Sequence, residues 1–344
     1  MVETKATTEI HARRSWLGRL IIALAGRYGL GLALYLVLRL LLGDSLWWLA
    51  LLNNFMPYYF VPPLVFIPLL LLIHARRMAV RLLPLLLIAL WLYGPYWLPK
   101  STGVADESQL KLVTFNIQLA IPDLDVIGDW LKSTEADVIL LQELGPGNSI
   151  RIFDLLSDTY PYTVDLVGTT QSALSRLPIV DSERIDMGGW FGDRLVLDVE
   201  GESLAVYNIH MPVPYATDDP ALQGEDVPIL SIVQAYDETW RNTIIRNFLN
   251  RLNDETLPYI VAGDFNTSDN AVIYAELASR MRDSFREVGT GLGVSWPANG
   301  GWLPPLLRLD YVWHSEGLRA LSAELGPRLG SDHLPLIVTF ENLF

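Results

Sequence analysis

Hydrophobic residues are concentrated near the start of the chain, where three apolar stretches follow one another. These stretches cover about residues 20–42, 57–73 and 82–98. A helix needs roughly 20 apolar residues to cross a bilayer core, with about 17 at the lower end, so all three are long enough. A cleaved signal peptide would account for only one of them. Buried helices of a soluble protein would carry more polar interruptions. We therefore predict a membrane anchor of three transmembrane helices in residues 1–100.

Basic residues around these stretches predict the orientation of the anchor. No Lys or Arg separates the first stretch from the second. Those that precede the first stretch or separate the second from the third include Arg13, Arg14, Arg19, Arg76, Arg77 and Arg81. Loops rich in Lys and Arg stay in the cytoplasm. The prediction is a multi-pass protein of the plasma membrane, with a cytoplasmic N-terminus and an extracytoplasmic domain after Lys100. Arg27 and Arg39 lie inside the first stretch, and a charge within the bilayer is costly, so the sequence does not define the first and last residues of that span.

After Lys100 the pattern changes to short apolar runs that end in polar residues. Residues 101–108 are polar and predict a linker, which leaves 109–344 as a second domain. Buried or alternating runs of this length are typical of strands, and longer amphipathic runs are typical of helices. The predicted strands are 110–117, 136–142, 194–199, 203–209, 258–262 and 334–340, and the predicted helices are 124–132 and 229–252.

The charge of the chain divides at the same place. Residues 1–100 contain 10 Lys and Arg against 3 Asp and Glu, net +7, which leaves 15 against 36, net −21, for the rest. Tight binding to a polyanion such as DNA depends largely on Lys and Arg, so the acidic domain disfavours it. A nuclease is still compatible, because a bound cation changes the local field. The chain has no cysteine, which excludes disulfides and thiolate ligands.

Polar residues that can act in catalysis lie at the ends of the predicted strands. The strand 258–262 leads into Gly263-Asp264-Phe265-Asn266. Side chains alternate along an extended chain, so Asp264 and Asn266 point the same way and can together hold a water and a phosphoryl oxygen. An isolated Asp-Phe-Asn is a simple turn about as often. Ser331-Asp332-His333 precedes the last strand and supplies a second carboxylate and a titratable imidazole.

Two further strand ends carry candidate metal ligands. Asn116 lies at the end of the strand 110–117, and Glu143 follows the strand 136–142. A cation such as Mg²⁺ prefers oxygen ligands and needs one or two carboxylates, which makes Glu143 the first candidate. The alternative is a solvated glutamate at the start of a helix. His210 ends another strand, although a lone histidine is more often structural than catalytic.

Six short segments occur in a fixed order along the chain and decide between these alternatives. They are Thr114-Phe115-Asn116, Leu141-Gln142-Glu143, Asn208-Ile209-His210, Gly263-Asp264-Phe265-Asn266, Arg308-Leu309-Asp310-Tyr311 and Ser331-Asp332-His333. Together they resemble the endonuclease/exonuclease/phosphatase superfamily of metal-dependent enzymes that cleave phosphodiesters and phosphomonoesters. The resemblance covers residues 109–344. No single segment would be specific, but the ordered set is.

The resemblance implies a fold and a role for each residue. The implied fold is an α/β (α+β) four-layer sandwich of two mixed, mostly antiparallel sheets flanked by helices. The metal would be Mg²⁺ or Mn²⁺. The implied ligands are Glu143, Asn116 and Asp332, and the implied catalytic residues are His210, Asp264, Asn266, Asp310 and His333. Asp310 would orient His333, and Asp264 would position or deprotonate the attacking water. The partner of His210 stays open, with Tyr160 and Tyr162 as candidates.

Fold and core residues do not select a substrate, because members of this superfamily cleave nucleic acids as well as lipid phosphates. The loop 289–307 contains Trp296 and Trp302 and leads into Arg308, and these three are candidate substrate-binding residues. A row of exposed aromatic and leucine residues suggests contact with lipid, although packing on the domain itself is equally compatible.

The arrangement also resembles the membrane-anchored branch of the superfamily, similar to teicoplanin-resistance-type membrane phosphatases thought to act on polyprenyl pyrophosphate. We therefore expect a phosphoesterase that acts on a lipid-linked phosphate ester or pyrophosphate at the outer membrane face. An extracytoplasmic endonuclease or exonuclease is the alternative, with nucleic acid as the substrate. A non-catalytic binding domain is a second alternative.

Overall fold

The computed structural model describes residues 15–100, 109–119, 123–215, 229–299 and 301–341. The chain forms two compact units. The first contains the described parts of Met1–Leu42 together with Met56–Pro95, and the second contains Gly43–Phe55 and Tyr96–Phe344. The predicted linker 101–108 lies outside the described residues, as do Arg13 and Arg14.

The N-terminal hundred residues are helical. Their elements are α1 (Trp16–Leu42), α2 (Trp47–Asn53), η1 (Met56–Phe60), α3 (Val61–Leu72), α4 (Arg76–Tyr93) and η2 (Gly94–Trp97). Two helices, Trp16–Leu42 and Arg76–Trp97, are long and apolar enough to cross a membrane. A third span is obtained only if Trp47–Asn53 and Met56–Leu72, which meet at a bend of 70°, are counted as one. The structure thus supports two or up to three of the predicted spans.

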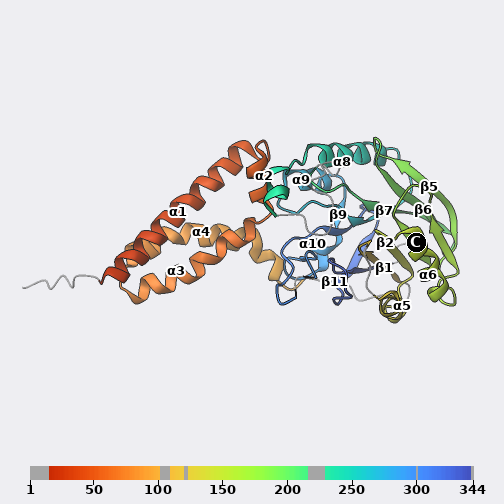
Figure 1. Cartoon of the computed structure of the whole chain (residues 1–344), viewed down its shortest axis with the longest axis horizontal. Helices are drawn as coiled ribbons and strands as arrows, with labels where there is room; N and C mark the ends of the chain where they lie inside the picture. The colour runs from red at the N-terminus through yellow and green to blue at the C-terminus, as the bar shows by residue number, and fades with distance from the viewer. Residues whose placement is uncertain (1–14, 101–108, 120–122, 216–228, 300, 342–344) are drawn as a thin grey trace, which may run out of the picture. The chain divides into compact units, whose positions relative to one another are not determined.

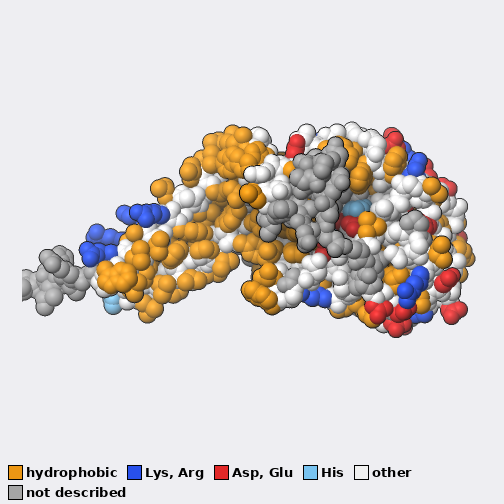
Figure 2. All heavy atoms as spheres, viewed as in Figure 1, with side chains coloured by type: hydrophobic (Ala, Val, Ile, Leu, Met, Phe, Trp, Pro, Cys, Tyr) orange, Lys and Arg blue, Asp and Glu red, His pale blue; other side chains and the backbone are white. Residues whose placement is uncertain are grey.

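The first unit is apolar both inside and outside. Its helices pack around small and branched residues that include Ala25, Leu32, Leu70 and Leu82. Its outer faces are hydrophobic as well, and Figure 2 shows apolar side chains covering much of this unit. A helix that is hydrophobic on all sides is typical of a membrane span.

The second unit contains two six-stranded sheets, and Figure 1 labels several of its strands and helices. The first has the order β11-β12-β1-β2-β4-β3 and the second has the order β5-β6-β7-β8-β10-β9. The strands are β1 (Gln109–Asn116), β2 (Val138–Gln142), β3 (Tyr162–Asp165), β4 (Ser172–Ser175), β5 (Ile179–Asp186), β6 (Phe191–Val199), β7 (Glu202–His210), β8 (Tyr259–Asp264), β9 (Arg282–Asp283), β10 (Asp310–His314), β11 (Arg319–Leu325) and β12 (Leu336–Glu341). The helices are α5 (Leu124–Ser133), α6 (Pro146–Leu156), α7 (Ile229–Gln234), α8 (Thr239–Leu252), α9 (Val272–Ala278) and α10 (Ser284–Val288).

Each sheet is mixed in the same way. One pair of neighbouring strands is parallel, β1 with β2 in the first sheet and β7 with β8 in the second, and the other pairs are antiparallel. A parallel pair needs a crossover connection, which α5 provides for β1 and β2, and α7 and α8 provide for β7 and β8. The expected mixed and mostly antiparallel sheets are therefore present.

Alternation along the strands divides the core of this unit. In β1, Leu110 and Leu112 join the cluster between the two sheets, whereas Val113 and Phe115 pack with α5 and α6. The same alternation in β7 places Val206 between the sheets and Tyr207 against α8. Successive side chains of a strand point to opposite faces, so a strand buried on both faces is hydrophobic at nearly every position. Helices therefore cover the outer face of each sheet (Figure 1).

The predicted helix 229–252 is wrong in one respect, because the structure interrupts it. The chain forms α7 and α8, with residues 235–238 between them. Tyr236 pairs with Tyr215 in an isolated antiparallel bridge, and the N–H of Asp237 donates to the carbonyl of Pro214. The side chain of Asp237 then accepts a hydrogen bond from the N–H of Thr239. Backbone groups used in this way cannot continue a helix, and the side-chain contact starts a new one.

Candidate active site

Three neighbouring strands of the second sheet bring polar residues to one edge. In the register of β7, β8 and β10, His210 lies opposite Asp264, and Asp310 lies opposite Asp264 on the other side. Asp264 ends β8, where its side chain is 1% exposed. The pairing of these strands therefore fixes a histidine and two carboxylates as immediate neighbours.

The first sheet contributes to the same place. Asn116 ends β1, and Glu143 follows the last residue of the parallel neighbour β2. The amide Nδ2 of Asn116 donates to Glu143 Oε1 at 2.9 Å and to Asp264 Oδ2 at 3.0 Å. Asn116 is fully buried, and its two hydrogen bonds join the sheets where their polar strand ends meet.

Two imidazoles approach this carboxylate cluster. His210 Nε2 lies 3.5 Å from Glu143 Oε1 and 3.9 Å from Asp264 Oδ2. His333 Nε2 lies 3.6 Å from the same Asp264 oxygen, and its Nδ1 lies 2.8 Å from Asp310 Oδ2. A carboxylate on one ring nitrogen fixes the orientation of the ring and directs the other nitrogen at the reaction. His333 is held in this way.

The turn after β8 depends on unusual backbone conformations. Gly263 has φ +140°, and a Cβ at this position would lie 1.8 Å from the carbonyl oxygen of Ile209. Asn266 has φ 48°, its N–H donates to Asp264 Oδ1 at 2.8 Å, and its Nδ2 donates to the carbonyl of Met211 at 2.9 Å. A non-glycine residue with positive φ is held by its surroundings, and such residues are common at functional sites.

Burial shifts the pKa values of the central residues. Burial raises the pKa of Asp264 to about 7, with a further increase from the charge of Asp310 and an opposing effect of His333. Burial alone would lower the pKa of His333, but the carboxylates of Asp310 and Asp264 outweigh it and raise the pKa to about 10. Burial lowers the pKa of His210, against the opposing charge of Glu143. One imidazole is therefore stabilised as a cation and the other as a neutral base.

The other predicted residues lie in different surroundings. Asp332 Oδ2 accepts a hydrogen bond of 3.1 Å from Trp296 Nε1, so Trp296 contacts a candidate metal ligand. Trp302 is 89% exposed. Arg308, expected to bind substrate, is instead 2% exposed and forms two hydrogen bonds with Asp283. A buried guanidinium engaged in this way is not available to a phosphate.

Several residues around the site were given no role by the sequence analysis. Gln142 Nε2 donates to Asn208 Oδ1 at 2.7 Å, which joins the two sheets below the site. The phenol of Tyr215 has a pKa raised by burial and, to a smaller extent, by the charges of Glu143 and Asp332. Gln142 and Asn208 belong to two of the six ordered segments, which was the available signal, but neither was given a role. Tyr215 lies in a loop without a motif and gave none.

The candidates for a partner of His210 lie elsewhere. Arg176 stacks on the ring of Tyr160, with 5.4 Å between its guanidinium carbon and the ring centroid. Tyr162 pairs with Ser175 in the first sheet. The indole nitrogen of Trp190 donates to the backbone carbonyl of His210. The carboxylates near the imidazole ring of His210 are those of Glu143 and Asp264.

A core of two sheets that carries carboxylate, amide and imidazole groups at one edge defines a hydrolase site of the phosphoesterase type. The model of the Endonuclease/Exonuclease/phosphatase family matches residues 113–333. The chain belongs to this family, whose members are metal-dependent phosphoester hydrolases. No curated protein matches the sequence.

Solved structures have the same fold at low sequence identity. An endonuclease/exonuclease/phosphatase from Bacteroides vulgatus has a TM-score of 0.56 and 15% identity, over 68% of this chain and 99% of that one. The mannosyl-6-phosphatase Bt3783 of Bacteroides thetaiotaomicron has 0.52 and 14%, over 68% and 100%. A humanized D. rerio TDP2 has 0.52 and 18%, over 68% and 99%.

The side chains at this site suit a divalent cation. Among the described residues, ligand atoms lie within 4.8 Å of one another in two groups, Glu143 with His210 and Asp264, and Asp264 with Asp310 and His333. Asp310 Oδ1 is buried and has no hydrogen-bond partner within the described part of the chain. Hard oxygen donors with an unsatisfied acceptor fit a cation such as Mg²⁺ or Mn²⁺.

Proposed function

We propose that this chain is a membrane-anchored phosphoesterase that uses Mg²⁺ or Mn²⁺ to hydrolyse a phosphate ester or pyrophosphate bond of a lipid-linked substrate at the outer membrane face. The observation that carries the proposal is the joining of Glu143, Asn116 and Asp264 across the two sheets, with His210 and His333 beside them. In-line attack on phosphorus needs a positioned nucleophile and positive charge near the equatorial oxygens.

Each residue has a proposed role that follows from its surroundings. Glu143, Asn116 and Asp332 would hold the cation, which when bound neutralises charge on the phosphoryl oxygens. Asp264, with a pKa of about 7 raised by burial, is suited to accept a proton from the attacking water. His333, kept cationic by Asp310 and Asp264, is suited to face a developing negative charge.

A lipid substrate is supported by the loop that precedes β10. Trp302 is 89% exposed and Leu303 is 44% exposed. Arg328 donates to the carbonyls of Gly301 and Leu303 at 2.7 and 2.6 Å, which holds this apolar tip in place. The base of the loop contacts the site, since the N–H of Ala298 donates to the carbonyl of Asp332. An apolar tip next to a phosphoester site is suited to an acyl or prenyl chain.

The substrate is tested with one panel at equal enzyme concentration and Mg²⁺. It contains polyprenyl pyrophosphate, phospholipids, plasmid DNA and RNA. We expect the lipid substrates to be turned over fastest, and a double variant Trp302→Ala with Leu303→Ala to lose activity on them. Val167→Ala, a change at an apolar residue that is 91% exposed on another loop, is the matched control. Faster turnover of DNA or RNA, with no effect of the loop variant, would support the nuclease instead.

The proposed orientation has a separate test. An alkaline phosphatase fused after Lys100 should be active, and a cytoplasmic fluorophore fused at the same position should be dark. The opposite pattern would place the catalytic domain in the cytoplasm. It would leave the phosphoesterase in place but exclude action at the outer face.

A further inference from the structure

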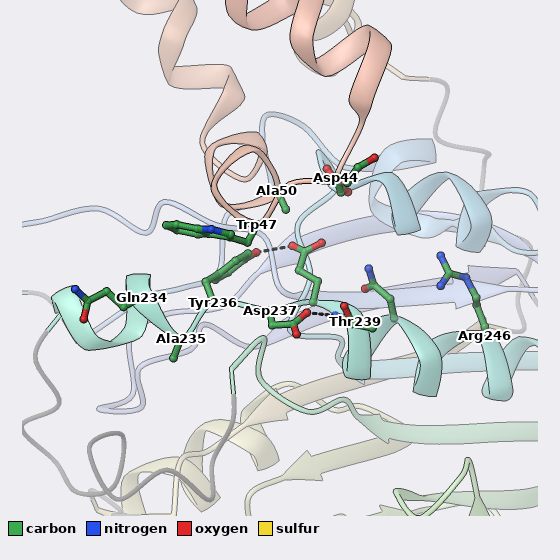
Figure 3. Close-up of a pocket in the computed structure, with 12 residues that line it drawn as sticks. Asp44, Trp47, Ala50, Gln234, Ala235, Tyr236, Asp237, Thr239 and Arg246 are labelled. Atoms are coloured by element: carbon green, nitrogen blue, oxygen red, sulfur yellow. Dashed lines mark hydrogen bonds between the residues drawn. The ribbon is translucent and has the colours of Figure 1, made fainter.

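Residues 43–55 lie between α1 and α3 in the chain, yet they pack as part of the unit that holds the active site. Asn53 and Asn54 are 0% and 7% exposed there. The carboxylate of Asp44 accepts a hydrogen bond from the N–H of Val272, the first residue of α9. Figure 3 shows Asp44, Trp47 and Ala50 of this segment facing Tyr236, Asp237 and Thr239 across a pocket.

A chain of side-chain contacts leads from this segment to the catalytic turn, residues 263–266 at the end of β8. Asn54 Nδ2 donates to the hydroxyl of Tyr236 at 2.7 Å, and this hydroxyl donates to Glu238 Oε1. The same oxygen of Glu238 lies 3.2 Å from Arg241 Nη2. Arg241 Nη1 then donates to the carbonyl oxygen of Asn266 at 2.5 Å. Four side chains therefore connect the segment to the residue that completes the turn after β8.

All four of these side chains are buried. Tyr236 and Asn54 are each 7% exposed, Glu238 is 6% exposed and Arg241 is 1% exposed. Buried polar groups are costly unless they are hydrogen-bonded, and a bonded network permits one arrangement of its members. The network ends on Asn266, whose positive φ must be maintained by its neighbours.

The segment reaches the site by a second connection as well. Tyr236 is the bridge partner of Tyr215, and the N–H of Asp237 donates to the carbonyl of Pro214 at 2.9 Å. Met211, at the start of the same loop, accepts a hydrogen bond at its carbonyl from Asn266 Nδ2 at 2.9 Å. The residues that interrupt the predicted long helix thus contact the segment and also support a loop next to the site.

We propose that residues 43–55 are a working part of the catalytic domain, and that Asn54, Tyr236, Glu238 and Arg241 are positioning residues that hold Asn266 and the catalytic turn in place. This inference rests on the proposed function, because it assigns the turn a role in hydrolysis. Small displacements of a positioned group lower the rate without preventing substrate binding. The network should therefore act on kcat more than on KM.

The mildest test removes one hydroxyl from the full-length protein. In Tyr236→Phe, Asn54 Nδ2 keeps its bond to the carbonyl of Ala50, and Glu238 keeps Arg241, so folding should be preserved. Asn54→Ala breaks the same connection from the other side. The matched control is Tyr259→Phe, which removes a hydroxyl from β8, the strand that carries Asp264. Among the described residues, this hydroxyl bonds only to the carbonyl of Arg280.

We expect Tyr236→Phe and Asn54→Ala each to lower kcat about tenfold, which is about 1.4 kcal/mol, with little change in KM. The double variant should show no further loss, because both changes interrupt one connection. Hydrogen exchange of the backbone amides at 264–267, measured without substrate, should become faster in both variants. Tyr259→Phe should leave kcat and exchange unchanged.

Two results would overturn the inference. One is a wild-type kcat and unchanged exchange at 264–267 in both variants, even if the melting temperature falls, since the contacts would then be structural only. The other is a full additive loss in the double variant, which would mean that the two residues act independently. If the wild-type protein hydrolyses no phosphoester with any divalent metal, the proposed function fails, and the exchange measurement alone decides whether the network holds the turn.

Discussion

Asp310 and His333 form a buried hydrogen bond, with 2.8 Å between Asp310 Oδ2 and His333 Nδ1. The two residues come from β10 and from the loop before β12, and these two strands belong to different sheets. Their contact joins the sheets at the site, as Asn116 does from the other side. The orientation of the His333 ring therefore depends on the packing of both sheets.

Asp310→Asn should lower kcat by roughly 10²- to 10⁴-fold, because the amide cannot stabilise the charged imidazole or hold it in the same orientation. Steady-state kinetics at saturating metal measures the loss. Asp181→Asn, at an exposed carboxylate on β5, is the control and should be neutral. A kcat equal to that of the wild type would remove His333 from the proposed mechanism.

Chelation of divalent metal should abolish hydrolysis, and Mg²⁺ or Mn²⁺ should restore it. In Asn116→Ala, which removes a hydrogen bond to Glu143, the metal concentration for half-maximal activity should rise by about 10- to 100-fold. A rise in the wild-type melting temperature on addition of Mg²⁺ is an independent measure of binding. That rise should be absent in Glu143→Gln. Full activity in the presence of EDTA would contradict the proposal.

Gly263→Ala should destabilise the second unit by about 3 kcal/mol or more, because a Cβ would collide with the backbone of β7 and φ is positive. Thermal or denaturant unfolding of the variant measures the effect. Gly201→Ala has φ +96° but open space around the position, so it carries the conformational strain alone. We expect a cost of about 1 to 2 kcal/mol for this control. Equal losses in the two variants would show that the close approach to Ile209 is relieved elsewhere.

Acid should weaken the fold through Glu255. Burial alone would raise the pKa of Glu255, but hydrogen bonds from Arg194, the N–H of Leu257 and Tyr207 outweigh it and lower the pKa from 4.5 to about 2. A lowered pKa in the folded state stabilises the protein above pH 4.5, and this stabilisation is lost as the pH falls toward 2. The difference in unfolding free energy between wild type and Glu255→Gln should therefore shrink over this range. A difference in unfolding free energy that stays constant with pH would show that Glu255 is not the source of the acid sensitivity.

Local sequence was sufficient to predict much of the catalytic unit. Hydrophobic alternation placed β1, β2, β7, β8 and β12 within a few residues of their observed limits, because strands buried on both faces leave a continuous apolar signal. Polar residues at the ends of these runs are brought together by the pairing of the strands, as His210, Asp264 and Asp310 are. The ordered motifs were also sufficient to indicate the family that the match over 113–333 shows.

Other features were decided only by the tertiary structure, because they depend on partners far away in the chain. Arg308 turns inward because Asp283 neutralises it in a buried pair, and no local pattern marks that partner. The helix expected over 229–252 is interrupted because Tyr236 pairs with Tyr215 in a β-bridge and accepts a hydrogen bond from Asn54. Residues 43–55 lie between two apolar stretches and were included in the predicted anchor, yet they join the catalytic unit. Hydrophobicity along the chain records which residues avoid water, but only the folded packing determines which neighbours they meet.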